Sequence, residues 1–245
     1  MSFYKSIAPF YDYIFPPSPL QVKFIERISG NIEGIRILEV GGGTGNLAML
    51  LGEQGAQVDA IDLDEEMIAY ARKKAEGMEG INFFGMDMLD ISKKWESNSF
   101  DTVVSFGNTI VHLDDLLQIR SFFSMAKEVI KSGGHLIVQM INYDRILDQQ
   151  VEGLPAIENE EIKFQRFYDF HKSQNKIDFR THLKIKETGE EIRNVVKLFP
   201  LRKRQIEDLL GECGYKDIRF YGSFSGQPLS EESIPLIFSA RKPSR

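Results

Sequence analysis

Short apolar runs alternate with amphipathic stretches along the chain, beginning near Ile35 and continuing past Ile141. The apolar runs predict strands at Ile35–Val40, Gln57–Asp62, Ile81–Gly85, Phe100–Phe106 and His135–Ile141. The stretches between them predict helices near Asn46–Gln54, Glu65–Glu76 and Leu113–Lys131. Strands that alternate with helices usually form a parallel sheet, so this part of the chain is expected to be an α/β domain.

Capping residues agree with the predicted helices. Asp64 stands where a side-chain cap would begin the second helix, and Glu65 and Glu66 suit the positive end of its dipole. The segment KSGGH, residues 131–135, is expected to supply the glycine that ends the third helix before the fifth strand.

The pattern changes between Tyr143 and about Leu198, where alternating strands replace the helices. Turns are expected at KSQN, residues 172–175, and at ETGE, residues 187–190. The segment therefore predicts an antiparallel flap inserted into the α/β domain.

The rhythm of the α/β domain returns after Pro200. Ile206, Leu209, Leu210 and Cys213 share one face of a helix, which predicts that Cys213 is a buried core thiol. Gly214 is expected to end this helix, and residues 216–222 and 234–242 predict two further strands.

Composition narrows the class of protein. The chain has 245 residues, and no segment approaches the roughly 18 consecutive apolar residues of a membrane span. The first residues lack the pattern of a secretion signal, and the single cysteine cannot form an intramolecular disulfide, so we expect a cytoplasmic protein. A net charge of −6 argues against a nucleic-acid partner.

The stretch RILEVGGGTGNLAMLL, residues 36–51, joins the first strand to the first helix through a glycine-rich loop. Such a loop brings backbone N–H groups close to a ligand, although it can also be only a tight turn. The dinucleotide pattern G-x-G-x-x-G would need glycine at Asn46, and no G-K-[ST] follows for a Walker loop. The observed spacing is E-x-G-x-G-x-G, from Glu39 to Gly45.

Acidic residues also end the next two predicted strands. Asp62 ends the second strand, and a carboxylate there can bind both ribose hydroxyls of an adenosine. Its alternative role is helix capping, for which Asp64 is better placed. Asp87 follows the third strand and could accept a hydrogen bond from the adenine amino group, with Met88 against the ring; the alternative for Asp87 is a turn residue.

These motifs resemble the class I S-adenosylmethionine-dependent methyltransferases. The resemblance runs from Ile35 through FFGMDMLD and FDTVVSFGNTIVHL to Ile141, and the last helix and two strands complete it. It implies an α/β fold with a Rossmann-like, seven-stranded, mostly parallel sheet. The last strand, near Ile234–Ala240, would be antiparallel, and the flap would be an antiparallel β insertion.

The resemblance also assigns residues and segments. S-adenosylmethionine would be the cofactor, bound by Glu39, Gly41, Gly43, Gly45, Asp62, Leu63, Met67, Asp87, Met88 and Ser105. Residues 1–34 would form an N-terminal helical lid, residues 35–142 and 200–245 the cofactor-binding domain, and residues 143–199 the flap that caps the substrate.

The acceptor is expected to be a small molecule, methylated at nitrogen rather than oxygen. SFGN stands where the methyltransferases of exocyclic amines in nucleic acids carry N/D-P-P-Y/F. His112 and Tyr11 are candidate catalytic residues. The alternative for His112 is a structural role at the start of a helix, and the alternative for Tyr11 is an ordinary core aromatic. Asn108, Tyr143 and Arg180 are candidate substrate contacts, and no metal is assigned.

Two other functions stay open. A non-catalytic or regulatory module could keep the S-adenosylmethionine site without turnover, and a nicotinamide oxidoreductase is disfavoured by Asn46. A flap strand with an exposed edge could also pair two copies of the chain, which gives a homodimer as a further expectation.

Overall fold

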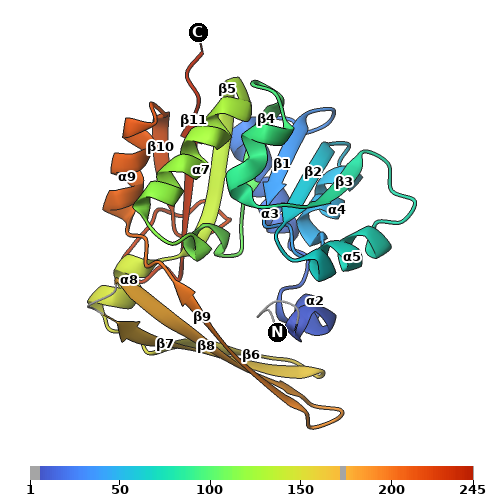
Figure 1. Cartoon of the computed structure of the whole chain (residues 1–245), viewed down its shortest axis with the longest axis vertical. Helices are drawn as coiled ribbons and strands as arrows, with labels where there is room; N and C mark the ends of the chain where they lie inside the picture. Colours follow the sequence, from blue (N-terminus) through green and yellow to red (C-terminus); the bar gives the residue numbers. More distant parts are fainter. Residues whose placement is uncertain (1–5, 172–174, 245) are drawn as a thin grey trace.

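A seven-stranded mixed sheet forms the centre of the protein (Figure 1). The computed structural model describes residues 6–171 and 175–244. The strands are β1 (Arg36–Val40), β2 (Gln57–Asp62), β3 (Ile81–Gly85), β4 (Phe100–Ser105), β5 (Ile130–Ile141), β10 (Lys216–Tyr221) and β11 (Pro235–Arg241). Their order across the sheet is β10-β11-β5-β4-β1-β2-β3. β11 is antiparallel to both neighbours and the first five strands are parallel, which confirms the predicted sheet.

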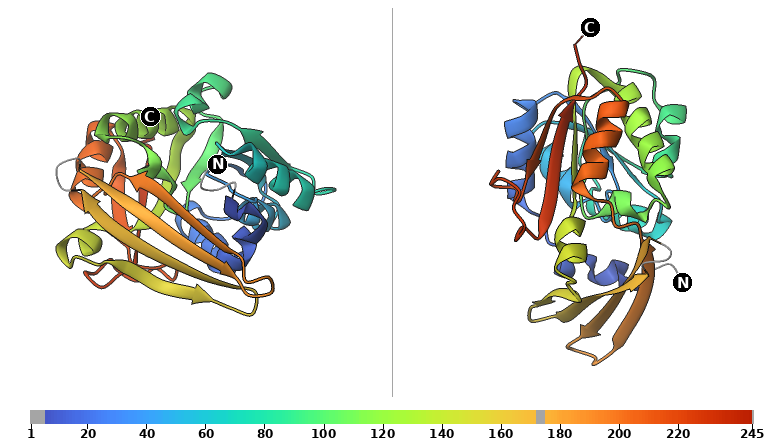
Figure 2. Two further views of the ribbon diagram at one scale, coloured as in Figure 1. Left: turned by 60° about the horizontal axis from the view of Figure 1, so that its bottom comes forward. Right: turned by 90° about the vertical axis from the view of Figure 1, so that its left-hand side faces the viewer.

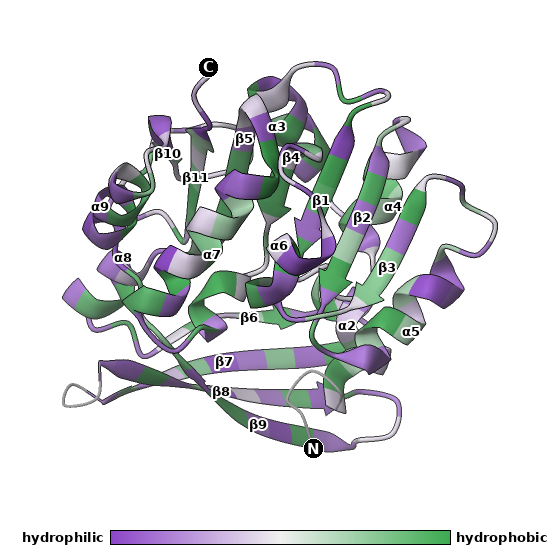
Figure 3. Ribbon diagram, turned by 45° about the horizontal axis from the view of Figure 1, so that its top comes forward, coloured by the Kyte–Doolittle hydropathy of each residue, from purple (hydrophilic) through white to green (hydrophobic). Residues whose placement is uncertain are grey.

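Helices cover both faces of this sheet, because successive strand residues point to opposite faces. The helices around it are α2 (Tyr11–Ile14), α3 (Pro19–Ser29), α4 (Asn46–Glu53), α5 (Glu65–Lys74), α6 (Ile91–Lys94), α7 (Leu116–Val129) and α9 (Lys203–Glu212). Ile37 of β1 belongs to an apolar cluster with α3, α4 and α5, whereas its neighbour Leu38 belongs to the cluster with α6, α7 and α9. Figure 3 shows the hydrophobic colour concentrated in the covered strands, as expected for strands buried on both faces.

A second, antiparallel sheet lies beyond the carboxyl ends of β1, β2 and β3 (Figures 1 and 2). It contains, in order, β6 (Gly153–Glu158), β7 (Ile162–His171), β8 (Lys176–Ile185) and β9 (Glu191–Leu198). This sheet, which we call the flap, confirms the predicted antiparallel insertion. Of the two expected turns, KSQN falls mostly on residues 172–174, outside the described residues.

The segment that was expected to contain only strands begins with a short helix, α8 (Tyr143–Asp148). Asn142 caps it, because its side chain accepts a hydrogen bond from the Arg145 N–H at 3.4 Å. A cap and a six-residue helix are too short to give a helical periodicity in the sequence. The alternating pattern of the strands that follow therefore determined the prediction, and the helix was missed.

The expected glycine stop after the third predicted helix is wrong. α7 ends at Val129, and Gly133 and Gly134 lie inside β5, where the register with β4 shifts between Phe100 and Thr102. A Cβ at Gly134 would lie 2.4 Å from the Asp101 carbonyl oxygen, so glycine is needed for close pairing of β4 and β5.

Cys213 is less buried than expected. It is the C-terminal cap of α9 and is only half-buried, with its Sγ 3.3 Å from the Ser124 hydroxyl. The helix face was predicted correctly, since Ile206 and Leu210 are fully buried. Gly214 follows with a φ of 73°, which confirms it as the residue that ends the helix. Within the described residues, no helix has the length and apolar character needed to cross a bilayer.

Candidate active site

The glycine-rich loop lies at the point where the strand order reverses, because β1 pairs with β2 on one side and β4 on the other. Gly41 and Gly43 have φ values of 78° and 54°, which favour glycine. A Cβ at Gly41 would lie 2.3 Å from the Thr109 hydroxyl, and one at Gly43 would lie 3.2 Å from the Tyr11 ring. The loop therefore fits between these two side chains only without side chains of its own.

Two cavities open on this loop. The larger, of about 790 Å³, extends along the ends of β1, β2 and β3, and the smaller, of about 290 Å³, extends toward the flap. Both are lined by Tyr11, Gly41, Gly107 and His112. These four residues are called the shared wall below, since a ligand in one cavity would meet a ligand in the other there.

Asp62 lies in the larger cavity, where its carboxylate holds the loop in place. It accepts hydrogen bonds from the Gly43 N–H at 2.9 Å and the Asp64 N–H at 3.0 Å. Burial raises the pKa of Asp62 above its usual range. Asp64 caps α5, as predicted, by accepting from the N–H groups of Glu66 and Met67. A carboxylate has about four acceptor positions, so Asp62 can still accept from a ligand.

The remaining residues at this end of the sheet also line the larger cavity. Asp87 begins a short helical turn, and its side chain accepts from the Leu89 N–H at 2.8 Å. Leu63, 74% exposed, together with Met67 and Met88 adds apolar surface to the same cavity. The sequence thus identified a continuous wall from the second and third strands.

Glu39 faces the smaller cavity with a carboxylate that is buried and only half satisfied. The side chain is 5% exposed, and its Oε2 has no hydrogen-bond partner among the described residues. Burial, with a contribution from the charge of Asp62, raises the pKa of Glu39 to about 8. A buried carboxylate in this state suits a cationic group that would complete its hydrogen bonds.

His112 and Tyr11 belong to the shared wall. His112 ends a short helical turn, η3 (Thr109–His112), and burial lowers its pKa to about 4. Its imidazole is therefore neutral near pH 7. Tyr11 begins α2, and burial and the nearby charges of Asp62 and Glu39 raise its pKa, so the phenol keeps its proton.

A polar cluster attaches α2 to the glycine-rich loop. Asp12 accepts from the Thr44 hydroxyl at 2.5 Å, from the Asn46 amide at 2.9 Å and from the Lys74 ammonium at 2.5 Å. Lys74 also donates to the Asn46 amide oxygen at 2.5 Å. Asn46, the residue that breaks the dinucleotide pattern, thus helps hold the N-terminal segment over the site; we call Asp12, Thr44, Asn46 and Lys74 the lid clamp.

Some predicted site residues do not reach either cavity. The Ser105 hydroxyl is buried and donates to the Val40 carbonyl, and a Cβ at Gly45 would meet Phe83 at 2.8 Å, so both serve packing. Tyr143 is fully buried, and its hydroxyl contacts Asn108, which does line the smaller cavity.

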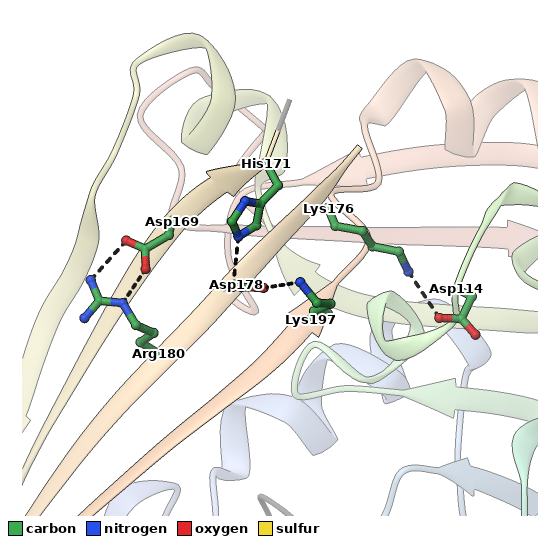
Figure 4. A network of polar contacts seen from close by, with 7 residues as sticks. All are labelled: Asp114, Asp169, His171, Lys176, Asp178, Arg180 and Lys197. Carbon is green, nitrogen blue, oxygen red and sulfur yellow. Dashed lines mark hydrogen bonds and ion pairs between the residues drawn. The ribbon is translucent and has the colours of Figure 1, made fainter. Parts of the chain in front are cut away.

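Arg180 lies on the other face of the flap. Figure 4 shows its guanidinium paired with Asp169, beside the group formed by His171, Asp178 and Lys197. The strand alternation accounts for this, because β7 and β8 place neighbouring residues on opposite faces of the flap.

The residues of β7 that do face the smaller cavity were missed from the sequence. They are Phe164, Arg166 and Tyr168, spaced by two, with Phe179 from β8 beside them. The period of two was visible in the sequence, but which of the two faces would point toward the cavity was not.

Comparisons with known proteins find methyltransferases. A family model described as a methyltransferase domain matches residues 37–134. YqeM of Bacillus subtilis, whose name assigns it provisionally to the methyltransferases, is 26% identical over 250 residues, covering 98% of this chain and 97% of that protein. Glycine/sarcosine N-methyltransferase of Aphanothece halophytica is 28% identical over 212 residues, covering 84% of this chain and 76% of that protein.

A solved structure shares the fold over the whole length. It is an S-adenosylmethionine-dependent methyltransferase from Clostridium acetobutylicum, with a TM-score of 0.79 and 17% sequence identity, and the match covers 99% of this chain and 100% of that chain.

Proposed function

We propose that this chain, which belongs to the class I S-adenosylmethionine-dependent methyltransferases, transfers a methyl group to a small-molecule acceptor, at nitrogen rather than oxygen. The observation that carries the proposal is the pair of cavities with one shared wall. The larger cavity would hold the cofactor, and the smaller one, which is covered by the flap, would hold the acceptor.

The cofactor fits the residues around the larger cavity by their chemistry. Asp62 would accept hydrogen bonds from the ribose, and Asp87 with Met88 would contact the adenine. The methionine moiety would extend past Gly41 into the smaller cavity, where the unpartnered oxygen of Glu39 would accept a hydrogen bond from its amino group. S-adenosylmethionine supplies the methyl group on a positively charged sulfur, and displacement from that sulfur depends mainly on alignment of the acceptor.

The shared wall favours nitrogen as the acceptor atom because it offers no strong base. An alcohol needs a base to take its proton, whereas an amine can arrive neutral with an available lone pair. His112, with a pKa of about 4, is a weak base, but its neutral ring can accept a hydrogen bond from an amine N–H. Such a bond would aim the lone pair at the methyl group. The name of the Aphanothece halophytica relative, which specifies an N-methyltransferase, supports this preference.

Calorimetric titration with S-adenosylhomocysteine, the product of methyl transfer, tests the cofactor site. The wild type should bind it, and Asp62→Asn should weaken binding by roughly 10- to 100-fold, since hydrogen bonds to a charged group are worth about 1.5–3 kcal/mol. Asp169→Asn, on the far face of the flap, is the matched control and should leave binding unchanged. A wild type that does not bind S-adenosylhomocysteine would contradict the proposal.

Transfer of labelled methyl groups to a set of small amines and their alcohol analogues tests the acceptor. Labelling of amines in preference to alcohols is expected. Labelling of alcohols alone would overturn the nitrogen assignment, and binding of the cofactor with no transfer to any member would favour the non-catalytic module.

A further inference from the structure

On its flap side, the smaller cavity carries two buried polar groups that no described residue satisfies. The Arg166 Nε and the Tyr168 hydroxyl are both buried and have no hydrogen-bond partner in the part of the chain that the structure describes. Both residues line this cavity, and Tyr168 as a whole is 3% exposed. An unsatisfied buried donor costs roughly 1–3 kcal/mol, more when it is charged, so such a pair is retained where a ligand completes it.

The position of these groups follows from the strand geometry. Arg166 and Tyr168 are two residues apart on β7, so they share the face that points away from the Asp169–Arg180 pair. Arg166 is opposite Thr181 on β8, whose buried hydroxyl also has no partner within residues 6–171 and 175–244. The polar groups therefore form one patch in an otherwise apolar part of the flap.

The positive charge of Arg166 determines which kind of ligand suits the patch. Among the described residues that line the smaller cavity, Arg166 is the only arginine or lysine. Its Nη2 donates to the Pro155 carbonyl at 2.7 Å, which fixes the guanidinium while leaving Nε available. No carboxylate in the described ranges pairs with it, whereas Arg180 on the opposite face is paired with Asp169.

Tyr168 adds a second donor to the same patch. Burial raises the pKa of its hydroxyl, so the group keeps its proton and can donate. Two donors on one face of β7, one of them positively charged, suit the recognition of an oxyanion.

We infer that the acceptor carries an oxyanion, such as a carboxylate, and that Arg166 and Tyr168 bind it. This inference rests on the proposed function, since it assumes that the smaller cavity is the acceptor site. With the oxyanion held by the flap, the amine at the other end of a small acceptor would reach the shared wall, where His112 lies. Arg166 and Tyr168 would then determine specificity without touching the cofactor.

Binding of small anions to the protein saturated with S-adenosylhomocysteine tests the inference. The probes are acetate, inorganic phosphate and, as a neutral analogue, acetamide, each followed by calorimetry. Acetate should bind with saturation and acetamide should not. Arg166→Met should weaken acetate binding about tenfold or more, as loss of a charge-assisted hydrogen bond predicts. Tyr168→Phe should weaken it about threefold, because it removes only a hydroxyl.

Arg180→Met is the matched control, since it removes the same charge from the opposite face of the flap and should leave acetate binding unchanged. Phosphate binding that depends on Arg166 more strongly than acetate binding would identify the oxyanion as a phosphate group. Equal binding of acetate in the wild type and in Arg166→Met, or no saturable binding of either anion, would overturn the inference.

Thermal unfolding gives a second measurement that does not depend on weak binding. Without ligands, Arg166→Met should raise the unfolding temperature or leave it unchanged, because it removes a guanidinium whose Nε is buried without a partner among the described residues. A large decrease would show that Arg166 is structural, contrary to the inference. The titration with S-adenosylhomocysteine separates the two proposals: a wild type that binds no cofactor product fails the proposed function, whereas cofactor binding with no anion dependence on Arg166 fails only this one.

Discussion

Single carboxylates at the site have different surroundings, although the sequence shows them as similar acidic residues. Asp62 accepts two backbone hydrogen bonds, whereas one buried oxygen of Glu39 finds no partner in the described part of the chain. The difference arises because Asp62 is the last residue of β2, beside the glycine-rich loop, whereas Glu39 lies within β1, before the loop begins. The protonation of Glu39 should therefore respond to a bound cation.

Glu39 gives a pH-dependent stability that can be measured. Its folded pKa of about 8 lies above the ordinary 4.5, so the folded state without ligand holds a proton that the unfolded state has lost. The contribution to stability is complete below pH 4.5 and is lost as the pH rises through about 8. Glu39→Gln cannot titrate, so its unfolding temperature should fall less than that of the wild type between pH 5 and about 8. Parallel curves would contradict the raised pKa.

Binding of the cofactor product should also depend on the protonation of Glu39. An ammonium group needs the ionised carboxylate, so the affinity for S-adenosylhomocysteine should rise as the pH increases from about 6 to 8, with release of a proton. Calorimetry in two buffers of different ionisation enthalpy measures that proton, and Glu39→Gln should abolish its release.

Elements differ in how well the sequence predicts them. The parallel strands and their helices are encoded locally, by apolar runs and by caps such as Asp64, and these were predicted closely. The bulge at Gly134 and the face of β7 that bears Arg166 depend on the partner strand and on the position of the flap. Local patterns carry no information on either, which is why Arg180 was expected at the site instead of Arg166.

The lid clamp is an element-scale contact with a direct test. Asp12→Ala removes the acceptor that joins Thr44, Asn46 and Lys74, and so releases α2 from the glycine-rich loop. Amide hydrogen exchange in residues 6–15 should become faster, and S-adenosylhomocysteine should dissociate faster, because Tyr11 would no longer be held over Gly43. Asp169→Ala, which breaks a pair on the far face of the flap, should change neither. Unchanged exchange in Asp12→Ala would show that apolar packing alone holds the segment.

At the scale of the whole molecule, the flap and the α/β domain are joined next to His112. The chain returns from β9 through Phe199, whose N–H donates to the Val111 carbonyl at 2.8 Å. Lys176 of β8 also pairs with Asp114 at 3.2 Å (Figure 4). Movement of the flap would therefore act on the turn that carries His112.

Pairing of two copies through a flap edge stays a prediction, and the charges of Glu191, Arg193 and Lys197 along β9 oppose it.

The shared wall also has a stereochemical consequence. A methyl group that passes directly from the sulfur in one cavity to an acceptor in the other is attacked from the side opposite to its sulfur. Each turnover would then contain one displacement, and one displacement inverts the arrangement of the three hydrogens. A cofactor whose methyl carries protium, deuterium and tritium in a known configuration should yield product of the opposite configuration; retention would require two successive transfers, and hence a side chain that is methylated in between.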